Sequence, residues 1–180
     1  MTARVEVIER VEPGVVSRAA AGDQGAFAEL VDTFHADLVR VAFAVAGDAE
    51  TGRDAAQAAW ETAWRKLPSL REHQKVRSWL LVIAANEARR LARRRRLREL
   101  IERRSRPTAS HADVEQTAIN IDLGRALARL NARDRQLLAL RFAVGLNSEE
   151  IAEVMALSAS GARSQLSRLL ARLRKDLSDE

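Results

Sequence analysis

The chain has 180 residues, with 30 Lys and Arg, 25 Asp and Glu, no cysteine, no tyrosine, 8 glycines and 3 prolines. The lack of cysteine excludes a disulfide scaffold and a thiolate metal site, and the scarcity of glycine and proline excludes collagen-like and low-complexity chains. Ala, Leu, Arg and Glu dominate, and these residues lose little rotamer freedom in a helix. We therefore predict an all-α protein with two small helical domains joined by a flexible linker.

Charge is distributed unevenly along the chain. Residues 1–60 carry 5 basic and 10 acidic side chains, residues 61–106 carry 15 and 5, and residues 107–180 carry 10 of each. A polyanion is the natural partner of the basic middle segment, whereas the acidic first third must face elsewhere or bind something basic. No apolar run approaches the ~20 residues of a membrane span, and the amino terminus lacks the apolar stretch of a signal peptide. We expect a cytoplasmic protein.

Residues 1–21 are predicted to be an amino-terminal arm. Apolar and charged residues alternate over the first 16 positions, and Pro13 and Gly14 close this segment, so it is either a disordered arm or a short edge element. We assign the arm no function.

The first domain is predicted to cover residues 22–104. Apolar residues recur there every three or four positions, which predicts helices. The expected helices have the approximate bounds 23–46, 54–67 and 77–104. Gly47 and Asp48 are read as the stop of the first helix, and Pro68 ends the second because the residue before a proline disfavours helix.

The second domain is predicted to cover residues 118–180, after a small, polar linker over residues 105–117 that lets the two domains move independently. Its expected helices have the approximate bounds 119–130, 137–144, 148–155 and 159–177. A short helix, the three-residue turn of Ala156, Leu157 and Ser158, and a longer final helix have the spacing of a helix-turn-helix.

No catalytic constellation stands out. His35, His73 and His111 are isolated, and the sequence has no glycine-rich phosphate loop, nucleophile elbow or paired-histidine helix motif. We expect neither an enzyme nor a protein that needs a cofactor or a metal.

The strongest signal is a run of ten arginines opposed by two glutamates in residues 89–106. Like charges at this density destabilise an isolated helix, so the run indicates a compensating polyanion, and a merely solvated face is the alternative. The helix-turn-helix is the second signal, because the first turns of its last helix enter the major groove. The side chains expected to read bases there are Ser158, Ser160, Arg163, Ser164, Gln165 and Arg168. A plain helical hairpin is the alternative.

Tryptophans give a third signal. Trp60 and Trp64 stand one turn apart, and such a pair belongs to a hydrophobic core more often than to a contact surface. Trp79 lies at the head of the basic helix, where an aromatic ring can stack on an unpaired base of a single strand. Core packing is the alternative for Trp79 as well.

In this order, these features resemble the extracytoplasmic-function type of bacterial RNA polymerase sigma factor, of the sigma-70 family, over about residues 22–175. The first domain is similar to sigma region 2 in AFAELVDTFHADLVRVAFAVAGD, RDAAQAAWETAWRKL and WLLVIAANEARRLARRRR. The second is similar to sigma region 4 in LARLNARDRQLLALRF, SEEIAEVM and SGARSQLSRLLARLR. Any one of these stretches is a weak match, but all of them in this order make a strong one.

The resemblance implies a subunit that binds core RNA polymerase, directs it to promoters and helps to melt the minus-ten region. The residues that match the polymerase-binding part are Asp54, Gln57, Trp60, Glu61 and Trp64. Those that match the part binding the minus-ten element, with a flipped nontemplate base, are Arg77, Trp79, Asn86, Arg89, Arg90, Arg93 and Arg94. The last helix matches the reader of the minus-thirty-five element. Implied partners are core polymerase, promoter DNA as duplex and melted strand, and an anti-sigma protein, which is common in the family.

The chain departs from the usual family pattern at a few positions. Ala58 stands where an acidic residue is common, Ala156 stands where glycine is common, and Gly161, Ala162 and Gln165 replace usual residues of the last helix. Two other classes stay open on the residues alone. One is a helix-turn-helix regulator that binds duplex DNA without polymerase, and the other is a helical interaction or RNA-binding protein. Transcription with purified core polymerase separates all three.

Overall fold

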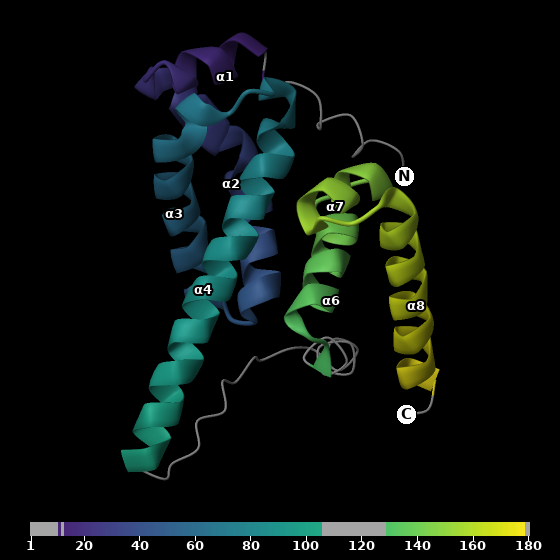
Figure 1. The fold of residues 1–180 in the computed structure, drawn as a ribbon. Coiled ribbons are helices and arrows are strands. Elements are labelled where there is room, and N and C mark those ends of the chain that lie inside the picture. Colours follow the sequence, from purple (N-terminus) through teal and green to yellow (C-terminus); the bar gives the residue numbers. More distant parts are fainter. Residues whose placement is uncertain (1–10, 12, 106–128, 179–180) are drawn as a thin grey trace.

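The computed structural model describes residue 11, residues 13–105 and residues 129–178. Within these ranges every regular element is helical, as predicted (Figure 1). The helices are α1 (Pro13–Ala20), α2 (Gln24–Ala46), α3 (Ala49–Lys66), α4 (Val76–Ser105), α6 (Ala132–Leu138), α7 (Ser148–Met155) and α8 (Ala159–Ser178). Helices α1 to α4 form what we call the N-terminal bundle, and α6 to α8 form the C-terminal bundle.

Helix α1 lies in the segment predicted to be an arm, and it corrects that prediction. Val15, Val16 and Ala19 are buried in the same core as α2. Pro13 occupies the first helical position, where its fixed φ suits a helix and its missing N–H costs nothing. The prediction of an arm rested on the alternation before Pro13, and a helix of two turns is too short to show a period of its own.

Helices α2 and α3 begin at aspartate caps. The Asp23 side chain accepts a hydrogen bond from the Ala26 N–H at 3.1 Å, and Gly47 ends α2 at φ 86°, both as predicted. Helix α3 begins earlier than predicted because Asp48 caps it, with its carboxylate accepting from the Thr51 N–H at 2.9 Å. The same dipeptide therefore stops one helix and starts the next.

The core of the N-terminal bundle lies between α2, α3 and α4. Leu30 and Leu38 of α2 and Leu80 and Leu81 of α4 are fully buried there. Such burial stabilises a fold by about 1.5–3 kcal/mol for each large aliphatic side chain. A methyl group on Gly52 would lie 2.8 Å from the Phe43 Cα, so this glycine lets α3 approach α2. The carboxy-terminal half of α4 extends past the rest of the bundle (Figure 1).

Two short 3₁₀ turns, Leu67–Ser69 and His73–Lys75, connect α3 to α4. They occupy the loop that the sequence predicted between these helices. In the C-terminal bundle, the π-helical turn Ala139–Ala143 continues α6, and Gly145 follows at φ 83°. Ser105, the first residue of the predicted linker, ends α4 instead. The rest of that linker and most of the helix predicted over 119–130 lie outside the described residues.

The helix-turn-helix predicted at the end of the chain is present as α7 and α8. Helix α7 has the predicted bounds, and Asn147 and Glu150 form a capping box at its start. Ala156 then turns the chain in the left-handed conformation, with φ 52° and ψ 53°. Leu169 and Leu173, four residues apart on one side of α8, are buried.

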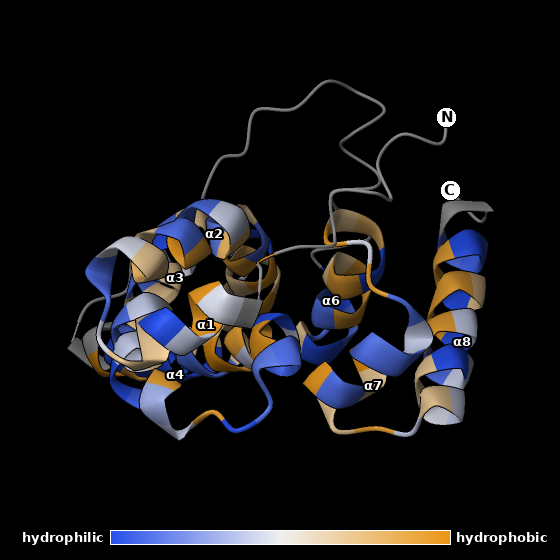
Figure 2. Cartoon of the chain, turned by 90° about the horizontal axis from the view of Figure 1, so that it is seen from above, coloured by the Kyte–Doolittle hydropathy of each residue, from blue (hydrophilic) through white to orange (hydrophobic). Residues whose placement is uncertain are grey.

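The two bundles pack against each other. Helix α6 contacts α2, and α7 contacts α4. Figure 2 shows α6 and α7 between the N-terminal bundle and α8, so that α8 lies on the far side of the molecule.

Candidate polymerase and nucleic-acid interfaces

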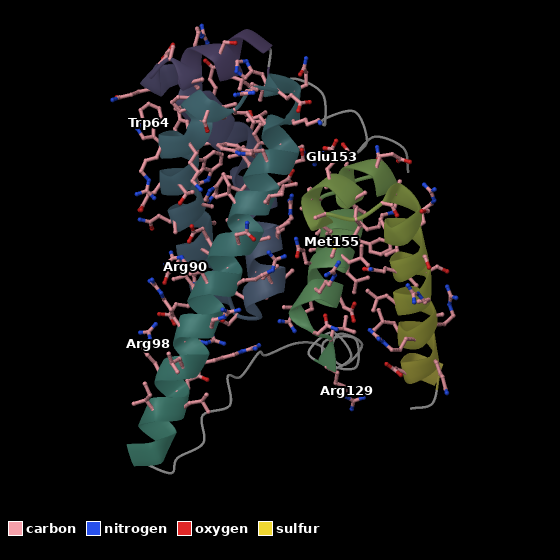
Figure 3. The ribbon with its side chains drawn as sticks, viewed as in Figure 1. Trp64, Arg90, Arg98, Arg129, Glu153 and Met155 are labelled. Carbon is pink, nitrogen blue, oxygen red and sulfur yellow. The ribbon has the colours of Figure 1, made fainter. Side chains whose placement is uncertain are left out.

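The predicted polymerase-binding residues lie on α3, and four of the five share one exposed face. Asp54, Gln57, Glu61 and Trp64 are solvent-exposed and follow one another at spacings of three and four residues. This spacing places them in one stripe along the helix. In Figure 3, Trp64 lies on the flank of the N-terminal bundle that is turned away from the C-terminal bundle.

Trp60, the fifth residue, belongs to the core. Its side chain is only 8% exposed, its ring meets Phe27 edge-on at 5.6 Å, and its indole N–H donates to His35 Nδ1 at 3.1 Å. Trp64 also packs edge-on against Phe27, at 4.8 Å, but is 36% exposed. Trp64 therefore connects the exposed stripe to the core through Phe27, the ring that Trp60 also contacts.

The predicted minus-ten residues lie on α4. Trp79, Asn86, Arg90 and Arg93 stand at spacings that place them along one side of the helix. Asn86, Arg90 and Arg93 are exposed, whereas Trp79 is half-buried and packs against the core. The Trp79 ring therefore has both a packing role and a free portion.

The arginines of α4 are held in different ways. Arg93 and Arg94 are exposed. Arg90 forms an ion pair with Glu87 at 2.6 Å, one turn away on the same helix. Arg95, which the run in the sequence does not distinguish from its neighbours, pairs with Asp48 and so fastens α4 to the start of α3. The arginine run is thus partly a structural element and partly a free basic surface.

Arg77 and Arg89, also in the minus-ten set, contact the C-terminal bundle. Arg77 pairs with Asp37 of α2 at 2.9 Å and donates to the Val144 carbonyl oxygen at 3.0 Å. Arg89 donates to Asn86 Oδ1 at 2.7 Å and to Gln136 Oε1 of α6. Burial, and after it the charge of the neighbouring Arg133, lowers the pKa of Arg89 from its ordinary value.

The predicted base-reading residues cluster at the start of α8. The Ser158 hydroxyl accepts from the Gly161 N–H at 3.0 Å, in the manner of a helix cap, while Ser160, Ser164 and Arg168 are exposed. Gln165 is half-buried.

Arg163 forms an ion pair with Glu149 of α7 at 3.4 Å, and both side chains are more than half exposed. Exposed pairs of this kind contribute little to stability, about 0–1 kcal/mol, so Arg163 is available to a ligand.

Known proteins match both bundles. The sigma-70 region 2 family model matches residues 30–98, and the sigma-70 region 4 model matches residues 121–173. The extracytoplasmic-function RNA polymerase sigma factor SigD of Mycobacterium tuberculosis is 32% identical over 184 residues, which cover 94% of this chain and 84% of SigD. The chain belongs to the extracytoplasmic-function sigma factors.

Two further similar proteins are a longer sigma factor and a sigma factor whose structure has been solved. The probable RNA polymerase sigma factor RfaY of Xanthomonas campestris is 30% identical over 88% of this chain, which spans only 42% of RfaY. The solved structure of CnrH in complex with the cytosolic domain of CnrY is 25% identical with a TM-score of 0.71, covering 93% of this chain and 97% of CnrH. CnrH itself comes from Cupriavidus metallidurans.

The departures of this sigma factor from the family pattern have local structural settings. Ala58 is half-buried beside the exposed stripe of α3. Ala162 is buried, and a methyl group on Gly161 would lie 3.0 Å from the Ser158 hydroxyl. Ala156 adopts the backbone conformation for which glycine is usual.

Sequence reasoning missed two residues of this sigma factor that connect the bundles. Arg135 donates to the Ala44 carbonyl oxygen at the end of α2, and Gln136 accepts from Arg89. No local signal marks them, because both stand in an ordinary helical pattern and their partners lie far away in the sequence. A polar residue such as Gln136 within an apolar helical stripe is the single feature that could have drawn attention.

No helix in residues 13–105 or 129–178 is both long and apolar enough to span a membrane. Within the same residues, His, Asp and Glu side chains form no group of three or more that could hold a metal ion.

Proposed function

We propose that residues 22–104 bind core RNA polymerase through α3 and the melted minus-ten strand through α4, while residues 118–180 read the minus-thirty-five element with α8. Residues 105–117 then serve as the connection between the two domains. The observation that carries this assignment is the exposed stripe of α3, because a helix-turn-helix regulator that acts without polymerase has no need of it.

The α3 stripe fits a basic protein partner. Asp54 and Glu61 supply negative charge, and Trp64 supplies a large, partly fixed aromatic surface. Aromatic residues anchored in this way are enriched among the residues that dominate binding energy, and complementary charge speeds association. The residues of the stripe match the family positions that grip a coiled coil of the largest polymerase subunit.

The α4 face fits an unpaired strand. The free portion of Trp79 offers a stacking surface, Asn86 offers hydrogen bonds, and Arg93 and Arg94 offer positive charge to phosphates. Extruding a base costs a few kcal/mol, and stacking on an aromatic ring returns about 1–3 kcal/mol. Melting by this route makes and breaks no covalent bond, so the proposed function needs no catalytic residue.

The start of α8 fits duplex DNA in the major groove. Arginine donates to guanine and glutamine pairs with adenine, and a good bidentate pair discriminates by about 1–3 kcal/mol. Arg163 and Gln165 are the side chains nearest the start of α8 that can form such pairs. Ser158, Ser160, Ser164 and Arg168 complete the surface toward bases and phosphates.

The location and partners follow from the same proposal. Core polymerase and promoter DNA occupy the bacterial cytoplasm, and we place the chain there. CnrH is bound to the cytosolic domain of CnrY in its solved complex, which supports the expectation of an anti-sigma protein as a further partner.

Transcription with purified core polymerase tests the proposal, and Trp79→Ala is its sharpest variant. A promoter selected from a randomised library with the parent chain provides the template. Trp79→Ala should form closed complexes almost normally but lower the permanganate reactivity of unpaired minus-ten thymines. A template already mismatched in that region should rescue much of the lost transcription, because the variant loses only a contact that exists after the strands part.

Two control variants separate stacking from packing. Trp79→Phe keeps an aromatic ring and should retain opening, while Leu91→Ala removes a half-buried side chain from the same helix and should not respond to the mismatched template. If Trp79→Ala melts at a lower temperature and the mismatched template gives no rescue, Trp79 is a core residue. If the parent chain directs no transcription at all, the proposed function is wrong.

A further inference from the structure

Arg135 of the C-terminal bundle completes the end of a helix in the N-terminal bundle. The last turn of α2 contains no basic residue, and only its Phe43 carbonyl oxygen accepts a backbone bond from the cap, from the Gly47 N–H at 2.8 Å. The later carbonyl groups of the turn have no partner within the helix. Arg135 donates through Nε to the Ala44 carbonyl oxygen at 2.7 Å and through Nη2 to the Val45 carbonyl oxygen at 3.4 Å. A cation at this position also matches the negative end of the α2 dipole.

The same arrangement occupies two arginines of the proposed minus-ten surface. Arg77 donates to the Val144 carbonyl oxygen, and Arg89 donates to Gln136, whose side chain is fully buried. These donors cannot also reach phosphates or bases. At the edge of the contact, the Ser78 hydroxyl donates to Glu153 at 3.2 Å, close to the place where Figure 3 shows Glu153 beside α4.

The contact between the bundles leaves polar atoms unsatisfied. Arg77 Nη1 and Gln136 Nε2 are buried and have no hydrogen-bond partner in the closed arrangement. Buried donors without acceptors oppose the closed arrangement, and both would gain water or phosphate partners when the bundles separate. Specific hydrogen bonds therefore stabilise the closed arrangement, and the unsatisfied donors destabilise it. This balance is expected of a contact between domains that opens.

The closed arrangement affects the two DNA-binding surfaces differently. It uses Arg77 and Arg89 of α4, whereas α8 stands on the far side of the C-terminal bundle with all of its reading residues except Gln165 exposed (Figure 2). A molecule in this arrangement keeps its minus-thirty-five surface open while its minus-ten surface is partly covered.

We propose that Arg135 holds this sigma factor in a closed state in which the C-terminal bundle competes with the minus-ten strand for Arg77 and Arg89. The proposal rests on the assignment of α4 to the minus-ten strand. Opening the closed state frees Arg89 from Gln136 and Arg77 from the Val144 carbonyl oxygen, while the Arg77 pair with Asp37 stays within the N-terminal bundle. The apparent affinity for the melted strand therefore depends on the fraction of open molecules.

A reversible lock tests the proposal. The chain has no cysteine, so Ser78→Cys and Glu153→Cys can be joined specifically by a bismaleimide linker that contains a reducible disulfide. The locked full chain should bind the single-stranded minus-ten oligonucleotide at least about tenfold more weakly than the reduced chain, the effect of withdrawing one charge-assisted bond or more. Binding of the minus-thirty-five duplex should not change.

The lock has a matched control and a clear contrary result. Arg18→Cys and Glu29→Cys, whose side chains lie 3.2 Å apart within the N-terminal bundle, carry the same linker without joining the bundles. This control should bind both probes like the parent. If the locked chain binds the minus-ten strand as tightly as the reduced chain does, the closed state does not compete and the proposal fails.

A variant that lacks the Arg135 side chain provides the complementary test, because it should favour the open state. Arg135→Ala should increase the distance between dyes placed at Ala28→Cys on α2 and Ala171→Cys on α8. It should also strengthen minus-ten strand binding by the full chain about tenfold. Arg133→Ala removes one charge from the same helix and should leave the dye distance unchanged. Equal dye distances and equal affinities in a folded Arg135→Ala protein would overturn the role of Arg135.

The failure of the closed state is distinguishable from the failure of the proposed function. Promoter selection with core polymerase and the reduced, unlocked chain depends on the function alone. If promoters are recovered but the lock has no effect on binding, the closed state is rejected and the proposed function stands. If no promoter is recovered, the assignment of α4 to the minus-ten strand is rejected as well.

Discussion

The two bundles hold their proposed binding residues in contrasting ways. In the N-terminal bundle some of these residues are tied to the rest of the bundle, as Trp64 is to Phe27 and Arg77 is to Asp37. In the C-terminal bundle the reading residues project from the exposed start of α8, and Arg163 has only an exposed partner. The difference teaches that substitutions at the tied residues of the first surface should affect folding as well as binding, whereas those at the exposed residues of the second should mainly affect binding.

Salt dependence is the largest expected effect, and it tests whether the two surfaces contribute alike. Seven arginines belong to the proposed DNA-binding surfaces, and 6–10 phosphate contacts weaken binding about 10³–10⁵-fold between about 50 and 200 mM salt. Arg93→Gln with Arg94→Gln, and separately Arg163→Gln with Arg168→Gln, should each reduce the slope of log affinity against log salt by about 1.5–2. The measurement is a promoter titration of the holoenzyme.

Arg95→Gln is the control for the salt titration. Its guanidinium is engaged by Asp48 and Glu99, so the slope should stay unchanged while the N-terminal bundle becomes less stable. An unchanged slope in the Arg93 and Arg94 double variant would mean that this part of α4 faces solvent or protein.

The second effect concerns the tryptophans of α3. Trp60→Ala removes a buried ring and its hydrogen bond to His35, and should lower the free energy of unfolding by about 3–5 kcal/mol. Trp64→Ala, in the exposed stripe, should cost much less stability and mainly weaken binding to core polymerase. Denaturant unfolding beside a polymerase binding assay measures both. Equal losses of stability would contradict the division between core and surface.

The third effect isolates the C-terminal bundle. Arg163→Ala or Gln165→Ala should lower discrimination among minus-thirty-five sequences by about 1–3 kcal/mol and leave the polymerase complex intact. Leu169→Ala, which removes a buried side chain of α8, should instead destabilise the bundle by about 2–5 kcal/mol. If both alanine variants bind every upstream sequence as the parent does, α8 does not read bases through these residues.

Local signals explain what the sequence could predict. The bounds of α2 and the turn between α7 and α8 follow from helical period and capping residues, which act within a few positions. The start of α3 was wrong because Asp48 was taken only as part of a stop. Helix α1 was missed because eight residues are too few to show a period.

The features that the sequence could not predict depend on contacts between residues far apart in the chain. The arginines of α4 look alike in the sequence, but Arg77 and Arg95 meet carboxylates of Asp37 and Asp48, which lie 40 or more positions earlier in the chain. Trp60 and Trp64 are likewise equivalent in the pattern, and only the packing of α3 on α2 separates the core residue from the exposed one. The contact of Arg135 with α2 depends on the packing of two bundles, which no helical period encodes.

The smallest effect concerns the turn that orients the C-terminal reading surface. Ala156 adopts φ 52° and ψ 53°, which costs a non-glycine residue about 1–2 kcal/mol. Ala156→Gly removes this cost but adds freedom to the unfolded chain, worth about 0.4–1 kcal/mol, so the net gain should be about 0.5–1 kcal/mol. Thermal unfolding should shift upward by a few degrees, and minus-thirty-five binding should stay the same because the α8 surface is unaltered. Ala171→Gly, at an exposed helical position of α8, provides the matched control and should lose about 1 kcal/mol. A lower melting temperature for Ala156→Gly would show that the turn carries no strain and that the orientation of α8 depends on the packing of its leucines instead.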